Sequence, residues 1–254
     1  MGKNSVIDLI QSHRSIRKFT DAPVSEKQID EVIASGRWAP TSHHVQAYSI
    51  IVVKEDAKKK ELAKLAGNQA YVESCPVFFV ICADFHRLKQ VSELHDQPFE
   101  VGEQENVLVG AVDAALVAQN MLLAARSFDL GGVMIGGIRN NPEAVSKLLN
   151  LPSYTFPVMG LCIGVPDQDP EQKPRLPKEA VVHQEQYDAT NLPKSIEDYD
   201  QVMETYYYNR TKGARADKWS EQMAHFFSTP KRPHVGEFLR GQGFLTRKDE
   251  LDKE

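Results

Sequence analysis

Residues 13–20, HRSIRKFT, place an imidazole, a hydroxyl and three permanent positive charges in a chain whose net charge is −5. If the chain is extended here, His13, Ser15 and Arg17 lie on one side, because side chains alternate along a strand. Such a group suits a phosphate, whose oxygens accept several hydrogen bonds. A solvated surface turn would use the same residue types, and the cluster alone leaves both interpretations open.

A second pair of cations, Lys173 and Arg175, lies in KPRLP (173–177). The prolines remove backbone donors and favour an irregular, extended segment, in which residues two apart face the same way. Together with residues 13–17 the pair could clamp a phosphate from opposite ends of the chain. An exposed Lys-Pro-Arg turn is the alternative.

The segment GGVMIGGIRNN (131–141) carries two glycine pairs. We expect Gly131 and Gly132 to end the preceding helix, since glycine supplies the left-handed conformation found there. Gly136 and Gly137 follow a strand-like run and would let the backbone approach a flat ligand with free N–H groups. An ordinary glycine-rich turn is also possible. The spacing matches neither the dinucleotide fingerprint nor a phosphate-binding P-loop.

Small hydroxyl side chains, Thr41 and Ser42, follow Pro40 in a loop before a strand. His43 and His44 invite a metal-site interpretation, but no acidic or cysteine ligand has a matching spacing, so we predict no metal. The chain also lacks a G-x-S-x-G nucleophile motif. Its three cysteines stand far apart, in apolar runs or beside a proline, which is typical of reduced, inert thiols in a cytosolic protein: Cys75, Cys82 and Cys162.

Apolar patterning indicates the elements that position these residues. We predict buried strands over 48–53, 76–84 and 156–165, and helices over 5–13, from a capping box at Ser25 and Gln28 to about Gly36, and over 56–66, about 102–128 and 142–150. The longest helix is apolar nearly all round, so we expect it to be buried on every side, in the core or against another subunit. Strands alternating with helices indicate an α/β or α+β three-layer domain.

Two segments are more polar. Residues 86–104 are acidic and predict a mobile excursion, and the last seventy residues are helical, with no obvious core of their own, so we expect them to pack on the main body. The pI of about 5.9 disfavours nucleic-acid binding by bulk charge. The absence of an apolar leader after Met1, and Asp113, Gln119 and Asn120 inside the longest apolar stretch, predict a soluble, cytoplasmic protein.

In their order along the chain, these segments resemble the FMN-dependent nitroreductase and flavin reductase family, in particular its longer, NADPH-dependent, oxygen-insensitive subgroup. The resemblance covers nearly the whole length and rests on HRSIRKFTDAPVS, QAYSIIVV, AGNQAYV, LVGAVDAALVAQNMLLAARSF, GGVMIGGIRNNPEAVSKLLNLP, FPVMGLCIGVP, KPRLP and a late YYYNRT…W segment. It implies an α+β three-layer sandwich, with a mostly antiparallel central sheet flanked by helices, that forms an intertwined homodimer. One FMN-binding domain would span 1–254, with 195–254 as a helical extension packed on the body.

The resemblance also implies roles for the candidate residues. His13 and Ser15, with Lys173 and Arg175, would hold the FMN phosphate, and Arg17 and Gln69 would lie at the pyrimidine edge of the flavin. Other cofactor contacts would come from Arg14, Ile16, Thr41, Ser42, His43, Met134, Ile135, Gly136 and Gly137, those of 41–43 from the partner subunit. Relatives often carry consecutive basic residues before the late tryptophan, thought to hold the 2′-phosphate of NADPH, and this chain retains Arg215 there.

The implied activity is that of an FMN-dependent NAD(P)H oxidoreductase, with NADPH preferred to NADH, which reduces nitroaromatics, quinones, azo compounds or free flavins in a ping-pong cycle. No side chain need act as acid or base, because the cofactor does the chemistry and the protein positions it. Two alternatives remain: a non-catalytic FMN carrier or sensor on the same scaffold, and a nucleic-acid module that uses HRSIRK as a basic patch.

Overall fold

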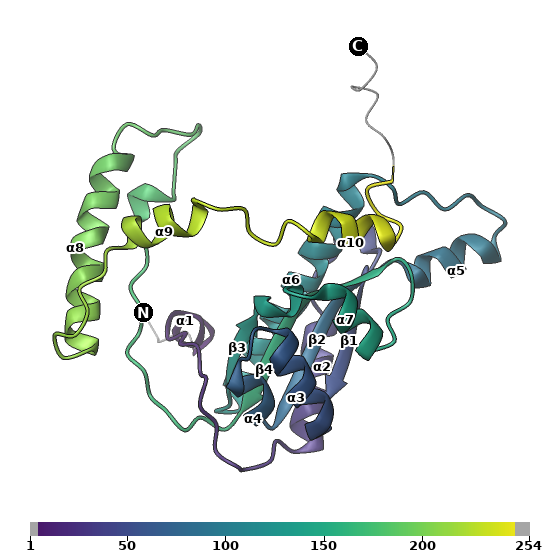
Figure 1. The fold of residues 1–254 in the computed structure, drawn as a ribbon, viewed down its shortest axis with the longest axis horizontal. Helices are drawn as coiled ribbons and strands as arrows, with labels where there is room; N and C mark the ends of the chain where they lie inside the picture. The colour runs from purple at the N-terminus through teal and green to yellow at the C-terminus, as the bar shows by residue number, and fades with distance from the viewer. Residues whose placement is uncertain (1–4, 247–254) are drawn as a thin grey trace. The chain divides into compact units, whose positions relative to one another are not determined.

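The computed structural model describes residues 5–246. The chain divides into two compact units, the first made of residues 1–169 with 232–254 and the second of residues 170–231 (Figure 1). Both ends of the predicted single domain, and the end of the predicted extension over 195–254, lie outside the described residues.

An antiparallel sheet forms the centre of the first unit. Over the described range it has four strands, in the spatial order β1 (Tyr48–Val53), β2 (Val77–Asp84), β4 (Thr155–Gly164) and β3 (Gly131–Ile135). Phe78 of β2 and Val133 of β3 both lie opposite Cys162 of β4. All eight residues of β2 are buried, which confirms the buried strand predicted for 76–84.

The first strand differs from its prediction. We expected 48–53 to be buried on both faces, but β1 is an edge strand with β2 as its only strand neighbour in the described sheet. Tyr48 and Val53 at its two ends are buried, whereas Val52 is 37% exposed. An unbroken apolar run cannot distinguish a central strand from an edge strand, because the run does not say what covers it.

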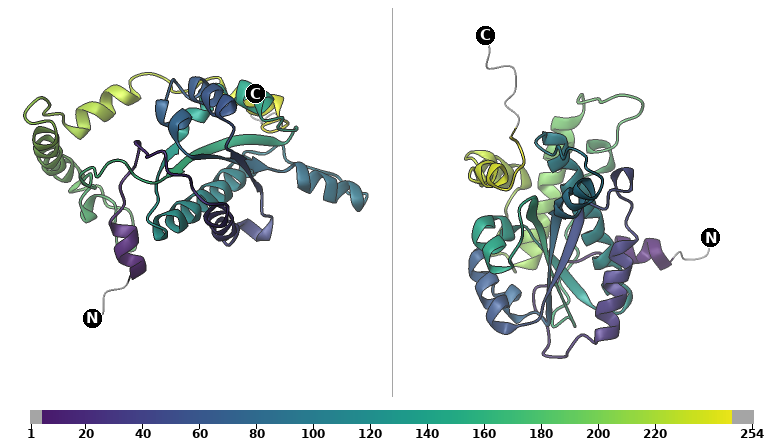
Figure 2. Two further views of the ribbon diagram at one scale, coloured as in Figure 1. Left: turned by 90° about the horizontal axis from the view of Figure 1, so that it is seen from below. Right: turned by 90° about the vertical axis from the view of Figure 1, so that its right-hand side faces the viewer.

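Helices cover both faces of the sheet and produce three layers (Figures 1 and 2). On one face α2 (Glu26–Arg37) and α6 (Gln104–Ser127) pack against Phe79 and Ile81. On the other, α3 (Asp56–Leu65), α4 (Ala70–Ser74) and α7 (Pro142–Leu148) pack against Phe78 and Val80. Successive β2 side chains therefore enter opposite layers, as a strand requires. The predicted α+β three-layer sandwich with an antiparallel sheet is confirmed.

The helix ends follow the sequence signals at two places and depart from them at a third. Ser25 and Gln28 form the predicted capping box of α2, and Asn141 caps α7 ahead of Pro142. Gly131 and Gly132, however, do not end α6. The left-handed residue after that helix is Asp129, at φ 58°, and the two glycines begin β3 instead.

Helix α6 is only partly buried within its own unit. Its core face includes Asp113, whereas Leu108, Val112 and Leu116 on another face are 59%, 55% and 38% exposed. The prediction of burial on every side is therefore not met by the single chain. Among the described residues α6 is also the one helix long and apolar enough to cross a membrane, but its buried face packs against the sheet.

Shorter elements complete the first unit: α1 (Ser5–Gln11), the 3₁₀ turns η1 (Ser42–His44) and η2 (Gly136–Arg139), α5 (His86–Leu94) and α10 (Val235–Gly241). Helix α5 occupies the first half of the segment predicted as a mobile excursion over 86–104. It has no buried residue, which accounts for the polar composition of a segment that is nevertheless helical.

The second unit consists of η3 (Lys178–Ala180), α8 (Leu192–Arg210) and α9 (Trp219–Phe227). It has a small core of Tyr199, Met203, Tyr206 and Tyr207, against which Trp219 and Leu176 pack. We expected the helical tail to have no obvious core of its own, and these buried aromatic side chains contradict that expectation. Tyrosine packs through its ring while its hydroxyl meets water or a polar partner, so aromatic cores of this kind are hard to recognise from hydropathy.

Candidate functional site

Residues 13–20 lie beside the outer edge of β3 and the end of β4. The Ile16 N–H donates to the Gly132 carbonyl (3.0 Å), and the Thr20 N–H donates to that of Val165 (2.9 Å). The Ile16 side chain is 7% exposed and covers Gly131, where a Cβ atom would stand 2.6 Å from Ile16 Cγ1. Ile16 thus fixes the segment to the sheet.

The polar members of this segment differ in what they contact. Arg14 forms an ion pair with Asp169, 2.5 Å from Nη1 to Oδ1. Arg17 is exposed, and its guanidinium has no hydrogen bond or ion pair to any described residue. Ser15 accepts a hydrogen bond from Gln168 at its backbone carbonyl only (3.4 Å). Arg17 and the Ser15 hydroxyl are therefore available to a ligand, whereas Arg14 already has an exposed ion-pair partner in Asp169.

Gln69 and the glycines after β3 come together at the opposite end of that strand. The Gln69 side-chain Nε2 lies 3.0 Å from the point where a Cβ on Gly137 would stand, and the Ala66 carbonyl oxygen is closer still. A Cβ on Gly136 would meet only the Arg139 guanidinium, 3.4 Å away. Gly137 is thus required by the packing of the protein itself, whereas at Gly136 the described residues would accept a Cβ in ordinary van der Waals contact.

These observations fit a flavin. The Gln69 Oε1 atom is buried and has no hydrogen-bond partner in the described structure, a costly state unless a ligand supplies a donor. The pyrimidine edge of a flavin carries an N–H that could do so. At Gly136 only the Arg139 guanidinium lies within 4 Å of where a Cβ would stand, so the packing of the described residues does not itself require a glycine there. Met134 is half-buried beside it, and Ile135 is buried.

The loop with Thr41, Ser42 and His43 is held by a buried carboxylate. Asp113 accepts the Ser42 N–H (3.0 Å) and the Ala47 N–H (3.1 Å). Ser42 and His43 are exposed, and His43 has a left-handed backbone at φ 46°. The loop is therefore rigidly anchored at its base while its polar side chains face outward. Their role at a cofactor stays a prediction.

Within the second unit, two of the predicted cations gather at one aromatic ring. Lys173 Nζ lies 5.5 Å and Arg215 Cζ 4.8 Å from the centroid of the Tyr207 ring. Burial raises the pKa of Tyr207, but the hydrogen bond and charge of Lys173, with the charge of Arg215, outweigh it and leave the pKa lowered. Arg175 donates from Nη1 to the Lys173 carbonyl (2.8 Å).

Three residues that we did not predict from the sequence gather at η2: Arg139, Arg232 and His234. Arg139 donates to the Val158 carbonyl, His234 Nε2 lies 3.2 Å from the Arg139 carbonyl oxygen, and Arg232 donates to Asn140 (2.8 Å). Burial, and then the charge of Arg232, lower the pKa of Arg139. The signal was available for Arg139, which belongs to GGIRNN. Nothing local marks Arg232 and His234, which are ninety residues away.

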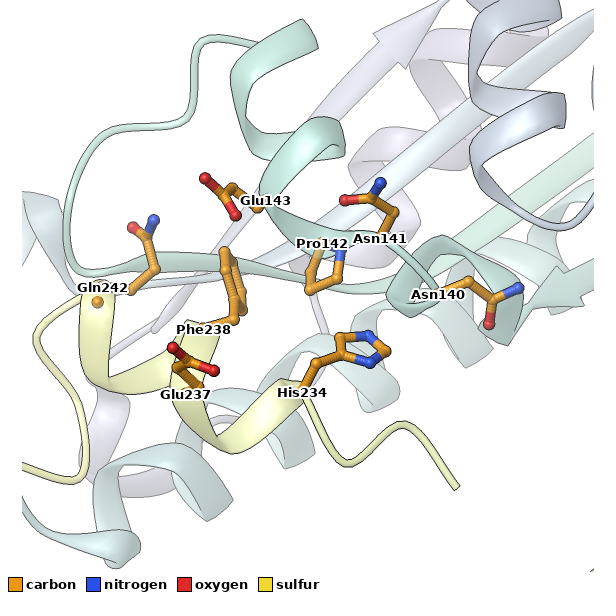
Figure 3. Close-up of a pocket in the computed structure, with 9 residues that line it drawn as sticks. Asn140, Asn141, Pro142, Glu143, His234, Glu237, Phe238 and Gln242 are labelled. Atoms are coloured by element: carbon orange, nitrogen blue, oxygen red, sulfur yellow. The ribbon is translucent and has the colours of Figure 1, made fainter. Parts of the chain in front are cut away.

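A pocket of about 550 Å³ adjoins this cluster between the start of α7 and α10 (Figure 3). In Figure 3 the side chains of Glu143 and Glu237 lie toward Gln242, and His234 lies toward Asn140. The lining residues are Asn140, Asn141, Pro142, Glu143, His234, Glu237, Phe238, Gly241 and Gln242. In the part of the chain that the structure describes, no group of three or more histidine, cysteine or acidic residues is placed to hold a metal ion.

The thiols are poor nucleophiles. All three cysteines are buried. Burial, and then the nearby charge of Asp84, raise the pKa of Cys82 to about 12, and burial followed by the neighbouring Cys75 raises that of Cys162. Because the thiolate is the reactive form, neither thiol serves covalent catalysis near neutral pH.

The chain belongs to the nitroreductase family: the model of that family matches residues 10–165, and the model of its C-terminal domain matches residues 173–247. An NADPH-flavin oxidoreductase of Vibrio harveyi is 43% identical over 96% of this chain and 100% of its own. An FMN reductase [NAD(P)H] of Bacillus subtilis is 42% identical, with the same two coverages. The structure of NfrA1 from B. megaterium superimposes with a TM-score of 0.94 at 46% identity, over 96% of this chain and 100% of the other.

Proposed function

We propose that this protein is an FMN-dependent NAD(P)H oxidoreductase that reduces nitroaromatics, quinones, azo compounds or free flavins in two-electron steps. The observation that carries the proposal is the buried Gln69 oxygen, which has no hydrogen-bond partner among the described residues, together with the neighbouring Gly136, where a Cβ would contact only Arg139. Family membership and the names of the relatives, which are flavin reductases using nicotinamides, support it. Those names favour an enzyme over a non-catalytic flavin carrier.

Each candidate residue would have its own role at the cofactor. FMN, when bound, would supply the transfer of two electrons, as a hydride taken from the nicotinamide, to the acceptor. The exposed guanidinium of Arg17 would stabilise negative charge on the reduced ring. Gln69 would accept a hydrogen bond from the pyrimidine edge of the flavin, and the backbone N–H near Gly136 would be directed at flavin N5. His13 and Ser15, with Lys173 and Arg175 of the second unit, would bind the phosphate.

We further propose a cytoplasmic homodimer in which both units of each chain form one functional domain. The exposed apolar face of α6, with Leu108, Val112 and Leu116, would be covered by the partner subunit. The anchored loop with Thr41, Ser42 and His43 would then reach the partner's cofactor. Sedimentation of the purified protein tests this directly: a monomer at micromolar concentration would contradict it.

The function itself is tested with the purified full-length protein. We expect a yellow protein that oxidises NADPH, and NADH more slowly, when nitrofurazone or FMN is supplied. A colourless protein that does not bind added FMN would overturn the proposal. A protein that binds FMN but turns over neither nicotinamide would be the carrier instead.

A further inference from the structure

Another cavity of the first unit, of about 630 Å³, lies beside the edge strand β1. Its lining comes from the end of α2, the loop around η1, β1 and α5. A cavity of this size is large enough for a small organic molecule. None of the residues predicted to bind FMN lines it in the described structure. Five of its lining side chains are aliphatic: Ile33, Val45, Ile50, Leu88 and Val91.

The charged side chains that line this cavity are basic. Its described lining includes two arginines, Arg37 and Arg87, and a histidine, but no aspartate or glutamate. Arg87 is already engaged, since it donates to the Gln46 carbonyl (3.2 Å) and forms an ion pair with Asp84 (3.3 Å). Arg37, in the last turn of α2, is exposed and makes no hydrogen bond or ion pair with a described residue. One guanidinium at the cavity therefore has no counter-charge.

His44 supplies a second donor. Its Nε2 atom lies 3.3 Å from the Gln46 side-chain Nε2, and an amide nitrogen can only donate. The neutral imidazole therefore accepts at Nε2 and carries its hydrogen on Nδ1, which has no partner among the described residues. The loop is fixed here, because Arg87 holds the Gln46 carbonyl. The imidazole is therefore held in place before a ligand binds.

These donors match one carboxylate. Its two oxygens accept in parallel from a guanidinium, and a neighbouring N–H adds a further hydrogen bond. A dianion would retain unpaired charge beside aliphatic side chains, which is costly. The same aliphatic side chains favour a ligand whose carboxylate is attached to an apolar body, because burial of that body removes it from water.

We propose that this cavity binds small monocarboxylic acids, with Arg37 and His44 at the carboxylate and the aliphatic side chains around an apolar ring or chain. The site goes beyond the proposed oxidoreductase function and does not depend on it. Arg37 supplies the charge that selects an acid over its neutral analogue. Removal of that charge should therefore weaken binding of the acid and leave the neutral analogue unaffected.

The first test is a ligand-observed NMR titration of the FMN-loaded protein with 3-phenylpropanoate and with its neutral amide. We expect the acid to bind with a Kd of about 1 mM or less, and the amide about tenfold more weakly. Arg37→Gln should weaken binding of the acid about tenfold and leave the amide unchanged. Lys60→Gln, which removes an exposed cation of α3, is the matched control. Equal affinities of acid and amide, or of wild type and Arg37→Gln, would overturn the proposal.

The second test locates the ligand. We expect 3-phenylpropanoate to slow hydrogen exchange in peptides covering 44–50 and 87–91 of the wild type but not of Arg37→Gln, while the flavin absorbance spectrum stays unchanged. A changed flavin spectrum without slower exchange at 44–50 would place the ligand at the cofactor and overturn the proposal.

A pair of variants at Val91 tests the cavity without changing Arg37. Val91 is 47% exposed, so a polar side chain is tolerated there. Val91→Glu adds a carboxylate to the lining and should bind 3-phenylpropanoate about tenfold more weakly than the isosteric Val91→Gln. Equal binding by the two variants would contradict the site. Absence of turnover with nitrofurazone would reject the proposed function and leave all three binding results to decide this proposal.

Discussion

The Nε2 atom of Gln69 lies 3.0 Å from the point at which a Cβ on Gly137 would stand. The turn before α4 and the turn after β3 are therefore in direct contact, and only a glycine fits between them. One residue earlier the situation is reversed, because a Cβ on Gly136 would meet nothing closer than Arg139 at 3.4 Å. The packing of the protein therefore requires a glycine at position 137 but not at position 136.

This difference predicts opposite effects on stability and FMN binding when alanine replaces each glycine. Gly137→Ala should destabilise the apoprotein by about 1–3 kcal/mol, because the Ala66 carbonyl cannot move without the backbone. Gly136→Ala should leave the free energy of unfolding unchanged but weaken FMN binding, because the methyl group would fill space meant for the ring. Denaturant titration of the apoproteins and flavin fluorescence titration measure the two effects. Normal FMN affinity in Gly136→Ala would exclude close approach of the ring there.

Arg17→Ala should slow flavin reduction without lowering protein yield or stability. The guanidinium has no protein partner in the described structure, so its removal costs no packing or ion pair. Its proposed role is to stabilise charge on the reduced flavin, and we expect a reduction at least tenfold slower, equivalent to about 1.4 kcal/mol. Anaerobic stopped-flow absorbance measures the rate, with Lys18→Ala as the neighbouring control. Equal rates in wild type and Arg17→Ala would place this arginine away from the flavin edge.

Asp113→Ala should destabilise the loop that carries Thr41 to His43. Asp113 is 0% exposed and accepts two backbone N–H groups, which would be left buried without an acceptor, at a cost of about 1–3 kcal/mol each. Denaturation measures the total loss, and faster hydrogen exchange at Ser42 and Ala47 would localise it. Asp30→Ala, on the exposed side of α2, should change stability by less than about 0.5 kcal/mol. Similar stability in the two variants would contradict the anchoring role.

Much of the fold could be predicted because its signals are local. The capping box at Ser25, the proline at the start of α7 and the apolar run of β2 each fix an element within a few residues. The order of segments along the chain then identifies the family. The two predictions that failed concern features set by neighbours distant in sequence. The edge position of β1 and the exposed face of α6 depend on what does or does not pack against these elements.

In the candidate site, too, local signals could be predicted from the sequence and contacts between distant residues could not. The GGIRNN and HRSIR segments can be recognised as candidate functional segments from their residue types. Those types do not show that Ile16 packs against Gly131, or that the Ala66 carbonyl packs against Gly137. A glycine required by packing and one left free for a ligand are identical in sequence. Tyr207 was missed because a tyrosine in a helix marks an aromatic core as readily as a platform for two cations.

The last prediction concerns Asp200, which joins α8 to α9. Its Oδ1 accepts the Ser220 N–H (2.9 Å), and its Oδ2 accepts the Ser220 hydroxyl. Burial acts to raise the pKa of Asp200, but the hydrogen bonds from Ser220 and the N–H of Trp219 outweigh it, and the pKa is lowered from 3.8. The ionised form also faces the positive N-terminal end of α9, which favours it further.

A carboxylate whose pKa is lowered on folding stabilises the folded state above its unfolded pKa, and this stabilisation is lost as the pH falls through the folded value. Asp200→Asn should therefore be less stable than wild type by about 1 kcal/mol at pH 7 and by the same amount at pH 5. The gap should shrink as the pH falls below 3.8. Trp219 fluorescence reports unfolding of the second unit, and Asp198→Asn, an exposed neighbour on α8, is the matched control. A gap that stays constant below pH 3.8 would show that the charge of Asp200 is not what joins the two helices.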